Sequence, residues 1–349
     1  MNHTRITSHG MGQILFCMLA IDLLIRPFSQ KNNISAQAYI PASILSAIIV
    51  LLLTAPFIKK LSAPVCETLQ AEWQKYFFAI PVLVLFSFSC TNTLVRTQLF
   101  FNFISDTQTV TIIPLILSFG VVFYAVYCGA RTLARVFGIV LWLLAASLLI
   151  LFLSTFSLMH TENLVMQPFS FFDFWTAVQN GFAFPAQIPL FLWFMVMCAH
   201  NEARHQYTST FISVVILSVV LSIATELVLG VQSQVQNQTI HAMARLGNLS
   251  VFQRLDALHS AIWLLLLLVK ACAFAVGAKL AVPGLLKSCQ QRWSYLVSFL
   301  ILIICYPIAS SFTEITRMRI ESLMSVIVMI AAGVHIFIVA RRQNHVTNH

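Results

Sequence analysis

Long apolar stretches recur along the whole chain, and this repetition most constrains what the chain can fold into. A helix needs about 20 apolar residues to cross the hydrocarbon core of a bilayer. Backbone groups in lipid must be hydrogen-bonded within their own segment, so the stretches are expected to be helices rather than open sheet. Hydropathy predicts an all-α, polytopic integral membrane protein with ten spans, at residues 11–29, 38–58, 77–103, 110–128, 136–158, 173–199, 209–231, 255–278, 293–311 and 322–340.

The charge content excludes a soluble protein. Hydrophobic residues make up 59% of the chain and charged residues 9%, against roughly 25% charged residues in an ordinary globular domain. A soluble protein of 349 residues has too much surface for so few charges to cover. The loops between the spans are short, which predicts a single transmembrane domain over residues 1–349, in contact with the lipid bilayer.

The net charge of +9 does not indicate a nucleic-acid partner. The basic residues lie in short loops between apolar stretches, where they determine membrane topology. No run of lysine and arginine is long enough to form a nucleic-acid patch. The sequence also lacks GxSxG, Walker A and HExxH motifs and metal-binding spacings of cysteine and histidine. We therefore expect no enzymatic activity, no cofactor and no metal site.

Charged residues inside the spans are the sharpest functional signal, because a charge in the hydrocarbon is costly and is retained for a reason. Asp22 lies in the first span and Lys270 in the middle of the eighth, while Glu226 and Arg96 lie near span ends and could reach the interface. One hypothesis pairs Asp22 with Lys270. The alternative pairs Asp22 with Arg26, four residues along the helix, and leaves Lys270 to backbone carbonyls.

The sixth span contains an interruption in the sequence QNGFAFPAQIP, residues 179–189. Gly181 lowers helix propensity, and Pro185 and Pro189 each lack the amide that an interior helical residue donates. Free backbone groups at membrane depth are tolerated only where they face protein or a cavity. The pattern therefore favours a broken helix that lines a ligand site, as in transporters. The alternative is a simple proline kink.

Three stretches together resemble a known family. Residues 107–139 run from an apolar span into a segment from Gly129 to Arg135, residues 162–169 read ENLVMQPF, and residues 252–274 read FQRLDALHSAIWLLLLLVKACAF. In these stretches, in length and in layout the chain resembles the GerAB-type spore germination proteins, the membrane-embedded B subunits of nutrient germinant receptors. These belong to the amino acid–polyamine–organocation transporter superfamily. The family often has a glycine in mid-span one, where this chain has residues 19–22, LAID.

The resemblance implies a LeuT-like fold in which two inverted repeats of five spans, at about 11–158 and 173–340, hold a ligand where spans one and six break. The ligand-binding residues that it implies in this sequence are Ala20, Ile21, Asp22, Leu23, Asn180, Gly181, Phe182, Ala183, Phe184 and Pro185. Asp22 and Lys270 would form an intramembrane charge pair between spans one and eight.

The function implied by the resemblance is that of a receptor subunit. It would bind a small nutrient, an amino acid by class, and trigger germination. Its partners would be an A-type membrane subunit and a C-type lipoprotein subunit in the inner spore membrane. The alternative function is an amino-acid permease of the same superfamily that transports its ligand.

Loop charges predict the orientation, because lysine and arginine are enriched in cytoplasmic loops. With the N-terminus inside, twelve basic residues fall in cytoplasmic segments and seven in outside segments. Both termini are therefore predicted to be cytoplasmic, on the spore-core side, and the loop at 232–254 to be outside.

Cysteine-accessibility labelling tests this orientation. A cysteine introduced at Gln236 should react with a membrane-impermeant thiol reagent added from outside, and one at Asn344 only after the inside is opened to the reagent. The reverse pattern would contradict the predicted topology.

Overall fold

The computed structural model describes residues 6–25, 36–61, 63–73, 76–105, 112–164, 170–181, 185–199, 204–234, 239–247, 255–285 and 293–347. Helices are the only regular secondary structure in these ranges. Among the described helices, seven are long and apolar enough to cross a membrane, as a multi-pass membrane protein requires: α2 (Ala36–Lys60), α4 (Tyr76–Ser105), α6 (Ala130–Thr155), α9 (Arg204–Leu229), α11 (Leu255–Leu285), α12 (Ser294–Ser311) and α13 (Glu314–Thr347).

Shorter apolar helices accompany them, namely α1 (Ser8–Ile25), α5 (Ile112–Cys128) and α8 (Gln187–Phe194), which continues as a π-helical turn η3 (Met195–Ala199). The other elements are α3 (Ala63–Trp73), α7 (Phe171–Gly181), α10 (Thr239–Leu246) and the 3-10 turns η1 (Phe156–Leu158), η2 (Thr161–Asn163) and η5 (Gly230–Gln234). The all-helical, multi-pass membrane class predicted from the sequence is confirmed. The number of ten spans stays a prediction.

The stretch predicted as one span at 173–199 contains two helices, α7 and α8. Pro185 lies just before α8 and Pro189 in its first turn, where the backbone amides have no helical acceptor anyway, so proline there breaks no hydrogen bond. The expectation that Pro189 repeats the defect of Pro185 was therefore wrong. The proline pair begins a helix rather than bending one.

Two helices, α6 and α13, begin six or more residues earlier than hydropathy predicted. α13 starts at Glu314 rather than 322, because its first turns carry charges at positions 314, 317 and 321 that lower the mean hydropathy without opposing helix formation. α6 starts at Ala130 rather than 136, directly after Gly129. Gly129 has φ +84°, a left-handed conformation that favours glycine, so α5 and α6 are joined through a single residue.

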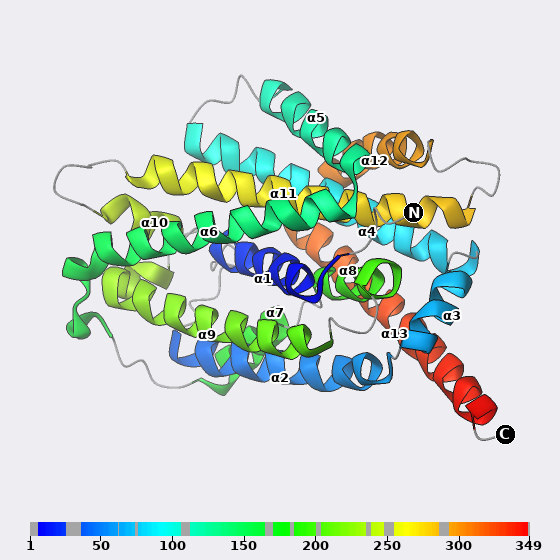
Figure 1. Cartoon of the computed structure of the whole chain (residues 1–349). Coiled ribbons are helices and arrows are strands. Elements are labelled where there is room, and N and C mark those ends of the chain that lie inside the picture. The colour runs from blue at the N-terminus through cyan, green and yellow to red at the C-terminus, as the bar shows by residue number, and fades with distance from the viewer. Residues whose placement is uncertain are drawn as a thin grey trace.

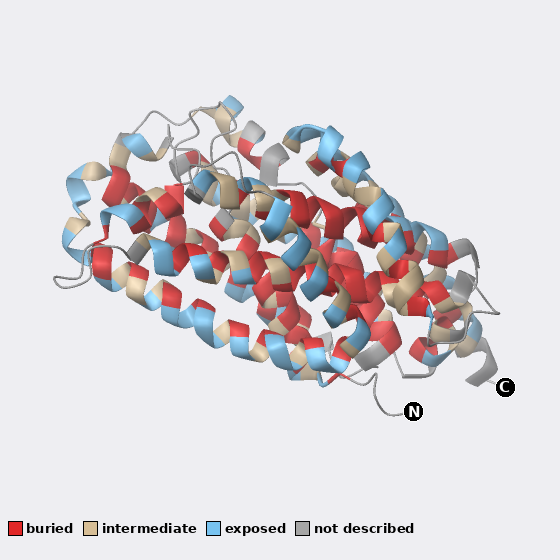
Figure 2. Ribbon diagram, turned by 90° about the horizontal axis from the view of Figure 1, so that it is seen from above, coloured by how far each residue is buried: buried red, intermediate tan, exposed pale blue. Residues whose placement is uncertain are grey.

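The helices α4 and α11 form the centre of the bundle. In their most apolar windows 83% and 72% of the residues are buried, against 22% in α2 and α12. Figure 1 shows α11 running along α4 through the middle of the molecule, with α5 and α12 on one side and α2 and α9 on the other. Buried residues follow the central helices in Figure 2, and exposed residues follow the outer ones. Large apolar side chains on that outer surface, such as Leu52 and Trp142, suit contact with lipid.

The short helix α3 is tied to the C-terminal half of α13. His335 Nε2 lies 2.5 Å from Glu72 Oε2, and Gln343 Nε2 donates to Thr68 Oγ1 at 2.9 Å. In Figure 1, α13 runs from the middle of the bundle past α3 to the C-terminus. The two helices are thereby fixed to each other at the end of the molecule where the chain finishes.

Close packing in the centre depends on Gly277 in α11. A Cβ added at this position would lie 2.4 Å from Leu190 Cδ1 of α8 and 3.0 Å from Phe86 Cδ2 of α4. Both neighbours are fully buried. Small residues let membrane helices approach to backbone contact, and Gly277 does so where three helices meet.

We expect Gly277→Val to destabilise the protein by about 1–3 kcal/mol, the usual cost of overpacking a filled core. Gly120→Val is the matched control, because a Cβ at Gly120 meets nothing within 4 Å and carries the same change in helix propensity. Thermal unfolding of both variants in detergent micelles measures the difference. Equal melting temperatures would contradict the close contact at Gly277.

Candidate functional site

A cavity of about 190 Å³ lies within the bundle, lined by α1, α2, α4, α9, α11, α13 and the start of α8. It is smaller than the roughly 300–1,000 Å³ of pockets that take drug-sized ligands, so it suits a small solute. Its polar side includes Asp22, Arg96, Gln187, Lys270 and Glu321. The rest of the lining combines apolar residues, here called the apolar wall (Leu19, Val50, Phe211, Val214, Val215 and Met318), with hydroxyl-bearing residues (Tyr39, Ser43, Ser46, Ser218 and Ser322).

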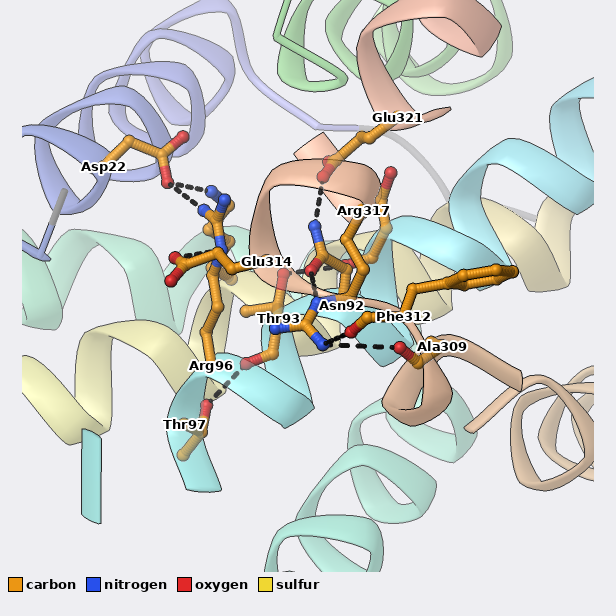
Figure 3. Close-up of polar contacts among 12 residues, drawn as sticks. Asp22, Asn92, Thr93, Arg96, Thr97, Ala309, Phe312, Glu314, Arg317 and Glu321 are labelled. Carbon is orange, nitrogen blue, oxygen red and sulfur yellow. Dashed lines mark hydrogen bonds and ion pairs between the residues drawn. The ribbon is translucent and has the colours of Figure 1, made fainter. Parts of the chain in front are cut away.

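The carboxylate of Asp22 is the meeting point of the cavity's polar groups. Lys270 Nζ of α11 donates to its Oδ1, and Gln187 Nε2 of α8 donates to its Oδ2. Arg96 Nη1 of α4 lies 3.7 Å from Oδ1 (Figure 3). Three helices are thus joined to the last turn of α1, which is the negative end of the helix dipole. The two cations balance both that dipole and the carboxylate.

Burial makes the pair of Asp22 and Lys270 sensitive to the loss of either partner. The Lys270 side chain is 4% exposed, whereas Asp22 and Arg96 are 28% and 21% exposed on the cavity side. A buried ion pair gains little over apolar residues of the same shape, but an ammonium left alone at such a site is strongly destabilising. Asp22 therefore compensates a charge that cannot reach water.

Arg96 also connects α4 to α13. Its Nε lies 3.8 Å from Glu314 Oε1, beyond hydrogen-bonding distance, and this Nε is buried without a hydrogen-bond partner. The guanidinium thus stands between two carboxylates, Asp22 on α1 and Glu314 on α13, without a short bond to either (Figure 3). The positive charge of Arg96 therefore lies between α1 and α13 and attracts a carboxylate on each helix.

A second polar chain begins one helical turn before Arg96. Asn92 Nδ2 donates to Glu321 Oε2, and Asn92 Oδ1 accepts from Arg317 Nε at 3.1 Å. Arg317 Nη1 donates to the carbonyl oxygens of Phe312, at 2.6 Å, and Ala309, at 3.4 Å. Figure 3 shows this sequence of contacts from the cavity residue Glu321 to the corner between α12 and α13. One amide side chain therefore separates a buried arginine from a cavity carboxylate.

The structure brings together part of the residue set selected from the sequence. Asp22 and Leu23 of α1 and Pro185 line the cavity. Ala20 and Ile21 are fully buried in the helix packing and are not among the lining residues. α1 is helical at all of positions 20–23, so the described structure has no break in this helix at the site.

The other selected residues lie at the edge of what the structure describes. Asn180 and Gly181 end α7, and Phe182, Ala183 and Phe184 lie outside the described residues, as does Arg26, the alternative partner of Asp22. The structure joins Asp22 to Lys270. Arg96 faces Asp22 as well, which the sequence analysis did not propose.

Sequence reasoning missed several polar residues of the site: Asn92, Gln187, Glu314, Arg317 and Glu321. A signal for three of them was present. Glu314, Arg317 and Glu321 follow each other at spacings of three and four, which places them on one face of a helix. Hydropathy averaging hid that face because it treats residues 314–321 as one polar segment.

Metal-ligating side chains do not gather among the described residues. Among the described residues, no group of three or more His, Cys, Asp or Glu side chains could hold a metal ion. Charges of both signs and an apolar wall instead enclose a small space, as in a site for a small dipolar solute.

Comparison with known proteins adds no assignment. Searches of protein-family models and of curated proteins found no match to the sequence. The structure itself defines the class as a multi-pass, α-helical membrane protein with a charged internal cavity.

We predict that Asp22→Asn destabilises the protein by about 3–5 kcal/mol, because it leaves the Lys270 ammonium buried without an anion. The double variant Asp22→Asn/Lys270→Met should recover most of the lost stability, since it removes both charges. Chemical or thermal denaturation in micelles measures the effect, with Glu67→Gln on the exposed surface of α3 as the control. A double variant no more stable than Asp22→Asn would refute the mutual compensation.

Proposed function

We propose that this chain is a membrane-embedded receptor subunit that binds a small zwitterionic nutrient, an amino acid by class, in the cavity beside Asp22. The observation that carries the proposal is the cavity's lining, which combines two basic side chains, two acidic ones and an apolar wall. A zwitterion that enters a bundle loses water from both of its charged ends. Fixed charges of both signs can replace that water.

The interrupted sixth span supports the same proposal. Pro185 and Gln187, at the start of α8, both line the cavity. The N-terminus of a helix is the positive end of its dipole, which favours a carboxylate. The carboxylate of an amino acid would bind there, as in transporters with discontinuous helices.

The fold proposed for the chain is the LeuT-like arrangement of two inverted five-span repeats. The seven long helices and the shorter apolar helices α1, α5 and α8 supply the elements that such a layout needs, and α7 with α8 corresponds to a broken span six. The resemblance to GerAB-type proteins supports this layout. The same resemblance supports the proposed setting: a germinant receptor B subunit in the inner spore membrane, with A-type and C-type partners.

An amino-acid permease is the second candidate, and the discontinuity between α7 and α8 is the observation that favours it. Discontinuous helices at the substrate site are typical of transporters that alternate access to the two sides. Both candidates bind the same class of ligand, so they differ in whether the ligand crosses the membrane.

The test of ligand binding uses the purified full chain in lipid nanodiscs with L-alanine, L-valine and L-leucine. A ligand at 100 times its Kd stabilises the folded state by about 2.7 kcal/mol, so at least one of the three should raise the melting temperature by several degrees. Val214→Trp, which fills the cavity from α9, should abolish this shift. Val220→Trp on the outer face of the same helix should not.

The outcomes separate the candidates. No stabilisation of the wild type by any of the three amino acids would overturn the proposed ligand class. Stabilisation without uptake of the radiolabelled amino acid into proteoliposomes supports the receptor, and concentrative uptake by this chain alone supports the permease. Genes for A-type and C-type subunits beside this gene would support the receptor assembly.

A further inference from the structure

Glu321 differs from the other acidic residues at the site in its partners. It lies on α13, lines the cavity and is half-buried. Its Oε2 accepts a hydrogen bond from Asn92 Nδ2 (Figure 3). No ion pair of the described residues includes Glu321. Its carboxylate is therefore oriented by a neutral amide.

The two basic residues of the cavity are directed elsewhere. Lys270 bonds to Asp22, and Arg96 stands between Asp22 and Glu314. Among the described residues, neither of the two basic side chains of the cavity pairs with Glu321. A negative charge removed from water is costly until a cation compensates it.

Arg317 lies one helical turn before Glu321 but does not compensate it. Its Nη1 donates to the carbonyl oxygens of Ala309 and Phe312, and its Nε donates to Asn92 Oδ1. Asn92 thus accepts from the guanidinium and donates to the carboxylate. The amide therefore orients the Glu321 carboxylate through a neutral group.

We propose that Glu321 binds the ammonium group of the ligand and makes the site selective for small molecules that carry a primary amine. The inference rests on the proposed function, because it names the group that recognises one end of the amino acid. The side chain of the ligand would then lie along the apolar wall at Met318, one turn before Glu321, and Val214 and Phe211 of α9. Charge-assisted hydrogen bonds from ammonium to carboxylate are among the stronger polar contacts in proteins.

The experiment compares three probes of one size on the full chain in lipid nanodiscs. L-valine carries both charges, 2-hydroxy-3-methylbutanoate replaces the ammonium by a hydroxyl, and isobutylamine lacks the carboxylate. Affinities are measured by calorimetry on the wild type, Glu321→Gln, Glu321→Asp and the control Glu67→Gln. Melting curves recorded without ligand show that each variant is folded.

We expect Glu321→Gln to lower the affinity for L-valine and for isobutylamine at least about tenfold, because one hydrogen bond to a charged group is lost. The affinity for the hydroxy acid should not change. Glu321→Asp should recover part of the affinity for the amine, and Glu67→Gln should match the wild type. The hydroxy acid should bind the wild type more weakly than L-valine does.

Each contrary result has its own meaning. If wild type binds L-valine and Glu321→Gln binds it equally well, Glu321 does not recognise the ammonium, and the proposed function stands. If wild type binds none of the panel or of the other amino acids, the proposed function itself fails. If sodium in place of N-methylglucamine stabilises the wild type but not Glu321→Gln without any amino acid present, Glu321 holds an inorganic cation instead, which overturns the inference.

Discussion

The ion pair between Asp22 and Lys270 is the constraint on which the rest of the site depends. The Lys270 side chain is 4% exposed, and an ammonium left alone at such a site is strongly destabilising, so the Asp22 carboxylate ties α11 to α1. Gln187 and Arg96 approach the same carboxylate from α8 and α4. The polar side of the cavity has its shape because these helices converge on one side chain.

The sequence predicts a site residue when that residue alone is energetically costly where it lies. It fails when the signal lies in several residues that share one helical face. A lone charge in an apolar stretch must have a partner, so Asp22 and Lys270 were recognisable as candidates from their positions alone. The acidic and basic residues at the start of α13 were not, because averaging over a window loses the information that Glu314, Arg317 and Glu321 share one helical face. Asn92 gives no signal in sequence, since its role arises only where α4 meets α13.

The sequence predicts helix interruptions only in part. Glycine and proline at 181–189 indicated an interruption, and α7 indeed ends at Gly181 with α8 starting at Gln187. The sequence alone did not show that Pro189 falls in a first turn, where it is harmless, because that depends on where the new helix begins. In α1, where the resembling family often has a glycine, residues Leu19 to Asp22 continue as regular helix.

The length of α13 has a mechanical consequence. Glu321 at the cavity and His335, bound to Glu72 of α3, are fourteen positions apart on this helix, which at about 1.5 Å per residue is roughly 21 Å. The helix contains no proline to bend it. It is therefore a stiff rod whose two ends must shift together. A tilt of this rod about its cavity end therefore displaces its α3 end in proportion to the distance between them, without relay through intervening side chains.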